Sequence, residues 1–129
     1  MPGGGGLMGR PSYRRGRLAE EHAARYLEGL GYAILARNWH CPAGEVDIIA
    51  REGEALVLVE VRARRQNNAF STPEETITST KGERLMQCGG YLVAEWDWDG
   101  PWRIDLVAVD LSRDGQPLRC RLIRSAVEG

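Results

Sequence analysis

Residues 44–64 read GEVDIIAREGEALVLVEVRAR, two extended apolar runs joined by a short polar segment. The second run, residues 55–64, is rich in valine, which is typical of strands. Gly53 suits the first central position of a two-residue type II′ turn, because that position requires a positive φ. The pattern therefore predicts a β-hairpin that closes with Glu52 paired to Ala55.

The register of this hairpin places acidic residues on neighbouring strands opposite other charged residues. Counted outward from the turn, Asp47 faces Glu60 and Glu45 faces Arg62. Because side chains alternate with a period of two, these four are expected to project from one face of the sheet. The other face is then apolar and is expected to carry Val46, Ile48, Val57, Val59 and Val61.

Two carboxylates directly opposite each other destabilise a strand pair unless something compensates their charge. A divalent cation such as Mg²⁺ or Mn²⁺ does so, since hard cations prefer oxygen ligands. A cross-strand charge network does so as well, with Arg62 or Arg64 neutralising the two acids and no metal present. The register leaves both explanations open.

A helix is predicted before the hairpin. From Gly16 to Leu30 apolar residues recur at helical spacing, and Gly31 supplies a C-terminal stop. Glu20 lies at the rim of this apolar stripe, where its carboxylate either reaches a site on the sheet or only borders the core. Residues 1–15, which include four consecutive glycines, are expected to form a flexible N-terminal segment.

The remaining sequence predicts a second helix and more strands. Thr72-Pro73-Glu74-Glu75 is typical of a helix start, and Thr80-Lys81-Gly82-Glu83 matches a capping box that predicts a helix to about Trp96. Further strands are expected over residues 33–38, 103–110 and 118–123. This order predicts an α/β or α+β fold with a mixed sheet.

The composition limits the classes of protein. The 129 residues suit one domain, and no apolar run approaches the roughly 20 residues that span a bilayer. The three cysteines include no C-x-x-C pair, so they form neither a disulfide framework nor a zinc site and indicate a cytoplasmic protein. Because the net charge is only −1, any contact with nucleic acid must be local.

The hairpin motif, residues 44–50 followed by residues 59–64, resembles the D…(D/E)-x-K signature of restriction-endonuclease-like nucleases. Over about residues 16–109 the chain is more specifically similar to the YraN family of small bacterial proteins, relatives in fold of archaeal Holliday-junction resolvases. Outside the hairpin the similarity rests on Gly16-Arg17-Leu18-Ala19-Glu20, Ala23, Tyr26-Leu27, Arg37-Asn38, Lys81 and Arg103-Ile104-Asp105.

This resemblance implies a single nuclease-like domain over residues 16–129, with an αβββαβ core in which helices flank a central mixed β-sheet. It also implies metal-dependent phosphodiester cleavage, with Asp47, Glu60 and the main-chain carbonyl of Val61 holding Mg²⁺ or Mn²⁺. Glu45 and Glu20 would lie nearby, as ligands of a second metal or as acids that position water.

The chain departs from the nuclease signature at Arg62, where the signature has lysine. Arginine keeps the positive charge but effectively cannot give up its proton, so it retains charge stabilisation and loses the role of a base. Lys81, at the start of the second helix, either assists a phosphate or is an exposed lysine. Arg64 and Arg37 are candidates for substrate binding, whereas Arg103 and Asp105 are expected to pair with each other.

The resulting hypothesis is a Mg²⁺-dependent endonuclease acting on DNA, of branched or damaged structure, in the cytoplasm. The alternative is a nucleic-acid-binding module that keeps the fold without cleaving. A third class, a scaffold that binds another protein, predicts binding that is insensitive to salt and to the acidic residues. By analogy with junction resolvases, a homodimer is expected.

Overall fold

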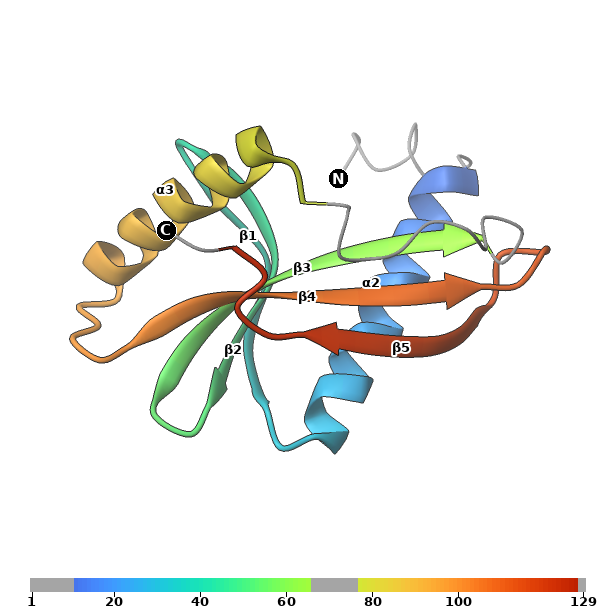
Figure 1. The fold of residues 1–129 in the computed structure, drawn as a ribbon, viewed down its shortest axis with the longest axis horizontal. Coiled ribbons are helices and arrows are strands. Elements are labelled where there is room, and N and C mark those ends of the chain that lie inside the picture. Colours follow the sequence, from blue (N-terminus) through green and yellow to red (C-terminus); the bar gives the residue numbers. More distant parts are fainter. Residues whose placement is uncertain (1–10, 66–76, 128–129) are drawn as a thin grey trace, which may run out of the picture.

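The protein is a five-stranded mixed sheet with one helix on each face (Figure 1), as seen in a computed structural model that describes residues 11–65 and 77–127. The elements are α2 (Pro11–Gly29), β1 (Ala33–Cys41), β2 (Gly44–Glu52), β3 (Ala55–Arg65), α3 (Ser79–Glu95), β4 (Trp102–Leu111) and β5 (Pro117–Ile123). The order confirms the α/β class and the αβββαβ core, to which β5 is added. No helix in this part of the chain is long and apolar enough to cross a membrane.

The strands lie in the order β1-β2-β3-β4-β5. All neighbours are antiparallel except β3 and β4, which are parallel because the chain crosses over through α3 between them. The predicted hairpin register is confirmed from Glu52 paired with Ala55 to Ile48 paired with Val59. Gly53 has a φ of 62°, as the predicted turn requires.

Helix α2 begins earlier than predicted. It starts at Pro11 and not at Gly16, and proline is favoured at the first helical position because its fixed φ suits a helix and its missing N–H is not needed there. The predicted flexible segment 1–15 therefore overlaps the helix, and its residues 1–10 lie outside the described residues. The helix stops before Gly31, as predicted, but Leu30 follows the last turn and is 47% exposed, so its assignment to the apolar stripe is wrong.

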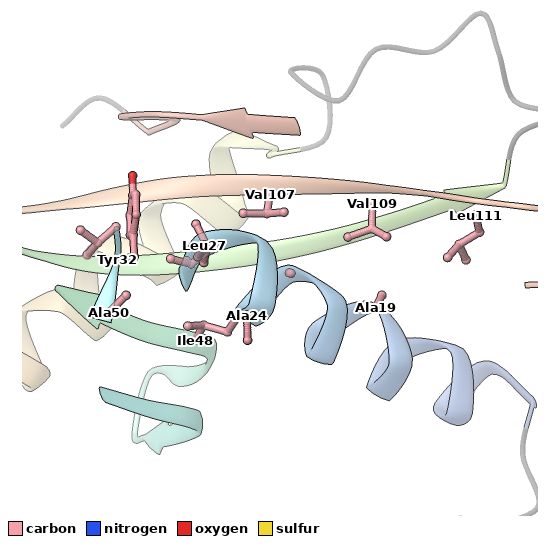
Figure 2. Packing of buried hydrophobic residues seen from close by; sticks show 12 residues of the cluster. Ala19, Ala24, Leu27, Tyr32, Ile48, Ala50, Val107, Val109 and Leu111 are labelled. Atoms are coloured by element: carbon pink, nitrogen blue, oxygen red, sulfur yellow. The ribbon is translucent and has the colours of Figure 1, made fainter. Parts of the chain in front are cut away.

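Helix α2 covers one face of the sheet through small and apolar side chains. Ala19, Ala23 and Leu27 are buried against residues of β2, β3 and β4 (Figure 2). The alanines let the helix approach the sheet closely, and burial of a leucine such as Leu27 stabilises the fold by about 1.5–3 kcal/mol. On the sheet this cluster includes Ile48, Ala50, Val57, Val59, Val107 and Val109.

Helix α3 covers part of the opposite face. Its N-cap is Thr78, whose side chain accepts a hydrogen bond from the Lys81 N–H at 3.2 Å, so the capping box predicted at Thr80 is wrong by two residues. The helix ends at Glu95, close to the predicted end. The helix start predicted at Thr72 lies outside the described residues.

The core under α3 combines aliphatic, aromatic and thiol groups. The helix contributes Leu85, Cys88 and Leu92, and the sheet contributes Val46, Ile49, Leu56, Leu58 and Ile104. Trp96, Trp98 and Trp102 close one end. The Cys41 and Cys88 Sγ atoms lie 3.5 Å apart as free thiols, and burial, together with Cys41, raises the pKa of Cys88 to about 12.

Two neighbouring glycines of α3 give a test of how closely the helix lies on the sheet. A Cβ on Gly89 would lie 2.2 Å from the Trp102 ring, whereas a Cβ on Gly90 would meet nothing within 4 Å. We expect Gly89→Ala to lower the free energy of unfolding by about 1–3 kcal/mol through overpacking. Gly90→Ala should raise it by about 0.5–1 kcal/mol, because alanine is the better helix former. Urea unfolding of both variants measures the difference, and changes of the same sign would contradict this packing.

Candidate acidic metal site

The site begins at an irregularity shared by β1 and β2. In the β1–β2 register Arg37 pairs with Ile48 and Trp39 pairs with Val46. Asn38, which lies between Arg37 and Trp39 on β1, has a left-handed φ of 53°. The regular alternation of β2 is also broken at this level: Val46 packs under α3 while Ile48 packs under α2, so the prediction that both share one face is wrong.

Asp47 lies at this irregularity, just beyond the end of the β2–β3 ladder at Ile48 and Val59. Its Oδ2 accepts a hydrogen bond from the Val61 N–H at 2.8 Å, so the carboxylate takes the place of a main-chain acceptor where the strands part. Burial raises the pKa of Asp47 to about 7, and the charges of Glu60, Glu20 and Glu45 add to the shift. A proton on this carboxyl group, or a cation beside it, would relieve the cost of burying its negative charge near other acids.

Glu60 is the second acid and is almost completely buried, with 3% of its surface exposed. Its Oε2 lies 2.8 Å from the Nζ of Lys81. Lys81 is in the first turn of α3, so the helix brings a cation onto the carboxylate from outside the hairpin. A lysine thus reaches Glu60 from α3, whereas position 62, two residues after Glu60 on β3, is an arginine.

Glu20 and Glu45 are joined through Asn38. With its amide oriented to donate, Asn38 Nδ2 lies 3.0 Å from Glu45 Oε2 and 3.2 Å from Glu20 Oε1. Burial raises the pKa of Glu20, and the charge of Glu45 raises it further. Glu20 therefore reaches the sheet, which is one of the two outcomes that its sequence position allowed.

Asn38 is a site residue that the sequence pattern did not single out for chemistry. Asparagine is depleted in strands but tolerates the left-handed region better than most residues. An asparagine inside an otherwise extended run was therefore the available sequence signal for an irregular backbone at this position.

The donor set suits a magnesium-like ion better than a metal that needs a complete protein cage. Among the described residues, no three histidine, cysteine, aspartate or glutamate side chains form a ready cluster for a metal ion. Asp47 and Glu60 supply two carboxylates, and Val61, whose N–H holds Asp47, also has a main-chain carbonyl. Mg²⁺ is commonly bound through one or two carboxylates while water and phosphate complete its coordination.

The three arginines predicted to take part in the site, Arg37, Arg62 and Arg64, lie on two different strands. Arg37 Nη1 bonds Glu21 Oε1 at 2.8 Å, on the α2 side. Arg62 and Arg64 follow Glu60 at alternate positions of β3 and pair with Ala108 and Asp110 of β4. The predicted pairing of Glu45 with Arg62 is not part of the β2–β3 ladder, because the ladder ends at Ile48 and Val59.

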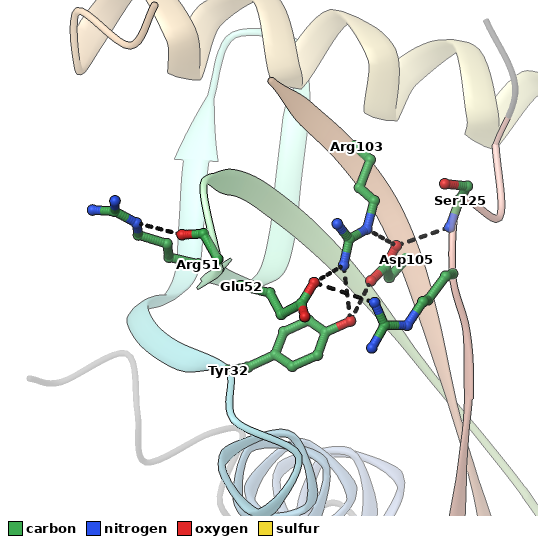
Figure 3. A network of polar contacts seen from close by, with 8 residues as sticks. Tyr32, Arg51, Glu52, Arg103, Asp105 and Ser125 are labelled. Carbon is green, nitrogen blue, oxygen red and sulfur yellow. Dashed lines mark hydrogen bonds and ion pairs between the residues drawn. The ribbon is translucent and has the colours of Figure 1, made fainter. Parts of the chain in front are cut away.

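Arg103 and Asp105 form the predicted pair and belong to a separate network (Figure 3). Asp105 is fully buried and accepts hydrogen bonds from Arg103 Nε at 3.0 Å, the Tyr32 hydroxyl at 2.9 Å and the Ser125 N–H at 2.9 Å. Arg103 also bonds Glu52 Oε1 at 3.0 Å. These contacts fasten the end of α2 and the segment after β5 to the sheet.

Comparisons with known proteins show that the chain is similar to one family of bacterial proteins. Residues 19–109 match the model described as "Uncharacterised protein family UPF0102". The chain is 43% identical to a UPF0102 protein of Chloroflexus aurantiacus over 104 residues, which is 79% of this chain and 83% of the relative. A UPF0102 protein of Roseiflexus castenholzii is 43% identical over 117 residues, covering 89% of this chain and 94% of the relative.

Proposed function

The chain belongs to the UPF0102 family, also called the YraN family, and from the chemistry of its acidic site we propose that it is a Mg²⁺- or Mn²⁺-dependent endonuclease acting on DNA. One observation supports this most: two carboxylates, Asp47 and Glu60, lie together where the hairpin strands part, and Lys81 bonds the second of them. Phosphodiester cleavage needs this combination of acids for a metal and a cation for the phosphate.

Asp47, Glu60 and the main-chain carbonyl of Val61 are the groups that would hold the ion. When bound, Mg²⁺ polarises a phosphate oxygen and lowers the pKa of a water molecule. Asp47 is oriented for this role by the Val61 N–H, which fixes one of its oxygens. Glu60 is fixed by Lys81 and by the walls of its buried position.

The proposed site has two cationic side chains, Lys81 on α3 and Arg62 on β3. Lys81 contacts Glu60 directly, with Nζ 2.8 Å from Oε2, so it can place a positive charge beside the reacting phosphate. Its place in the first turn of α3 also favours an anion there, because main-chain N–H groups are unpaired at a helix start. Arg62 keeps a permanent charge for stabilising the transition state.

Glu20 and Glu45 form the outer part of the proposed site. Both carboxylates lie within hydrogen-bonding reach of the Asn38 amide and add their charge to that at Asp47. We assign them to positioning water or to a second metal. Arg64 and Arg37 are assigned to substrate contacts, and the activity is placed in the cytoplasm with a homodimer as the assembly expected by analogy.

A second candidate is a DNA-binding module of the same fold that does not cleave. Arg62 favours this alternative, since an arginine in the lysine position cannot act as a base. The two candidates differ in what Lys81 does, because only an enzyme needs its contribution in the transition state.

The test combines metal binding with cleavage. We expect calorimetric titration to show Mn²⁺ or Mg²⁺ binding, and supercoiled, linear and branched DNA to be cut in the presence of metal and not of EDTA. Lys81→Met should keep metal binding within a few-fold and lower the cleavage rate by about 10²–10³, as expected for loss of a transition-state cation.

Arg84→Met is the matched control, because it removes a cation from the next turn of the same helix, where no ion pair to Glu60 is present. Metal binding and DNA binding without cleavage by the wild type would favour the binding module. Absence of metal binding, with and without DNA, would overturn the proposed metal-dependent activity.

A further inference from the structure

Two of the three cysteines meet on the α3 side of the sheet. Cys41 ends β1 and Cys88 lies within α3, and their Sγ atoms are 3.5 Å apart although the residues are 47 positions apart in the sequence. Both belong to the core under α3. Cys120, on β5, packs against the core under α2 instead. The fold therefore makes one pair of neighbouring thiols and leaves the third cysteine apart from them.

The turn between β1 and β2 brings the two thiols together. Cys41 pairs with Gly44 across this turn. A Cβ on Gly44 would lie 2.9 Å from Arg84 Cδ and 4.0 Å from Cys88 Sγ, so the glycine lets the turn lie directly against α3. Gly44 also has a φ of 146°, which residues with a side chain rarely adopt. The approach of the thiols thus follows from how the main chain of the turn packs on the helix.

The distance between the thiols suits a disulfide after a small movement. An S–S bond is about 2.05 Å long, so the two Sγ atoms must approach each other by about 1.5 Å. Small rotations about the two χ1 angles are movements of this scale. In the reduced protein the Cys41 thiol already donates a hydrogen bond to Cys88 Sγ, so the two sulfur atoms face each other.

The two thiols differ in exposure, and this gives them different roles. Cys41 is partly exposed at the end of its strand, whereas Cys88 is fully buried, so an oxidant in solution meets Cys41 first. Burial, and to a smaller extent Cys41 itself, raises the pKa of Cys88 to about 12. The contribution of Cys41 is lost once its thiol has reacted, and the charge of Arg84 favours the Cys88 thiolate. Cys88 is therefore the second and slower thiol to react.

We propose that Cys41 and Cys88 form a reversible disulfide by exchange with a low-molecular-weight disulfide. The Cys41 thiolate attacks one sulfur of that molecule, so a mixed disulfide forms at Cys41 and one small thiol leaves. Cys88 gives its proton to solvent and attacks Cys41 Sγ, which forms the Cys41–Cys88 bond and releases the second small thiol. Two protein thiols are thereby oxidised, and one small disulfide is reduced to two thiols. This inference does not depend on the proposed function.

The disulfide would join two elements that also carry residues of the acidic site. Cys41 follows Asn38 by three residues on β1, and Cys88 lies about two helical turns after Lys81 on α3. Closing a long loop restricts the unfolded chain, so the oxidised protein is expected to be the more stable form. In that form a covalent bond fastens α3 to the sheet.

The experiment follows the thiols of the full-length protein in mixtures of reduced and oxidised glutathione, in EDTA. Free thiols are alkylated, and mass spectrometry of the intact chain and of its peptides locates any disulfide. We expect one disulfide per chain, between Cys41 and Cys88, with Cys120 alkylated. Half-oxidation of the folded protein should need at least about tenfold less oxidised glutathione than half-oxidation of the chain in concentrated urea, because the fold holds the thiols together. The urea midpoint of the oxidised protein should be higher than that of the reduced protein.

Three matched variants separate the roles of the cysteines. Cys88→Ala should stop at a mixed disulfide between Cys41 and glutathione, and Cys41→Ala should leave Cys88 reduced. Neither variant should gain stability on oxidation. Cys120→Ala is the control and should form the Cys41–Cys88 disulfide at a glutathione ratio within about twofold of the wild type.

Four results would overturn the inference: both thiols remaining reduced, a disulfide that contains Cys120, a disulfide that joins two chains, or oxidation no easier in the folded protein than in urea. Metal binding and cleavage are measured on the reduced protein. They report on the proposed function separately, so either proposal can fail while the other stands.

Discussion

Asp47→Asn is expected to abolish metal binding and cleavage while making the folded protein more stable. The substitution keeps an oxygen that accepts the Val61 N–H but removes the negative charge that the ion requires. Cleavage should fall by at least about 10³-fold, which is the scale for loss of a central electrostatic group. The free energy of unfolding should rise by about 1–3 kcal/mol, because the buried charge near Glu60 is costly.

The pH dependence of this gain identifies its cause. Asp47 has a pKa of about 7 in the folded protein, whereas an aspartate in an unfolded chain titrates near 3.9. Between these values the folded state holds the extra proton, so the wild-type free energy of unfolding falls as the pH rises from about 4 to about 7. The stabilisation by Asp47→Asn should therefore be largest at pH 8 and small at pH 5, measured by urea unfolding in EDTA.

Glu54→Gln is the matched control for this prediction. Glu54 lies in the exposed turn of the same hairpin, so its substitution removes one negative charge without touching the site. Its stability should change by less than about 0.5 kcal/mol at either pH. Retention of full cleavage by Asp47→Asn would exclude Asp47 from the site, and a loss of stability would show that its charge is compensated in the folded protein.

Asp105→Ala is expected to be the most destabilising single change outside the hydrophobic core. It leaves the Arg103 guanidinium, the Tyr32 hydroxyl and the Ser125 N–H without their shared acceptor (Figure 3). Removing one partner of a buried ion pair costs about 3–5 kcal/mol, which is a large part of the stability of a small domain. Urea unfolding, or the yield of folded protein if the variant does not refold, measures the effect.

Asp110→Ala provides the comparison on the same strand. Asp110 pairs with Arg119, whose side chain is 69% exposed, so the loss should stay below about 1 kcal/mol. If the two substitutions lowered the free energy of unfolding by similar amounts, burial of the Asp105 ion pair would not increase the cost of breaking it. Metal binding by a folded Asp105 variant should be unchanged, because the network lies apart from Asp47 and Glu60.

The order of elements and the hairpin register could be predicted because local signals agreed with one another. Valine-rich runs, a glycine at the turn and alternation fixed the pairing of Glu52 with Ala55, and the ladder follows it to Ile48 and Val59. Gly31 marked the end of α2 in the same way. The beginnings of both helices were less predictable, since Pro11 and Thr78 start them at positions that compete with other plausible caps.

The candidate site was only partly predictable, because its geometry depends on a departure from the regular strand. Simple alternation put Val46 on the same face as Ile48, whereas the two pack on opposite faces at the level where Asn38 of β1 is left-handed. The contact between Lys81 and Glu60 depends on how α3 docks, which no local pattern contains. Glu20 could be placed at the rim of its helix, but its approach to Asn38 is a tertiary contact.

The irregular backbone of β1 also affects how the protein behaves at high concentration. β1 and β5 are the outer strands of the sheet, and exposed outer strands are where two molecules add to each other and start aggregates. In β1 the pairing shifts between Ile34 and Ala36 and the backbone turns left-handed at Asn38, so an incoming strand finds no long regular ladder. β5 begins at Pro117 and carries Arg119 and Arg121. The same departure from regularity that shapes the acidic site thus helps to keep the sheet from growing beyond one molecule.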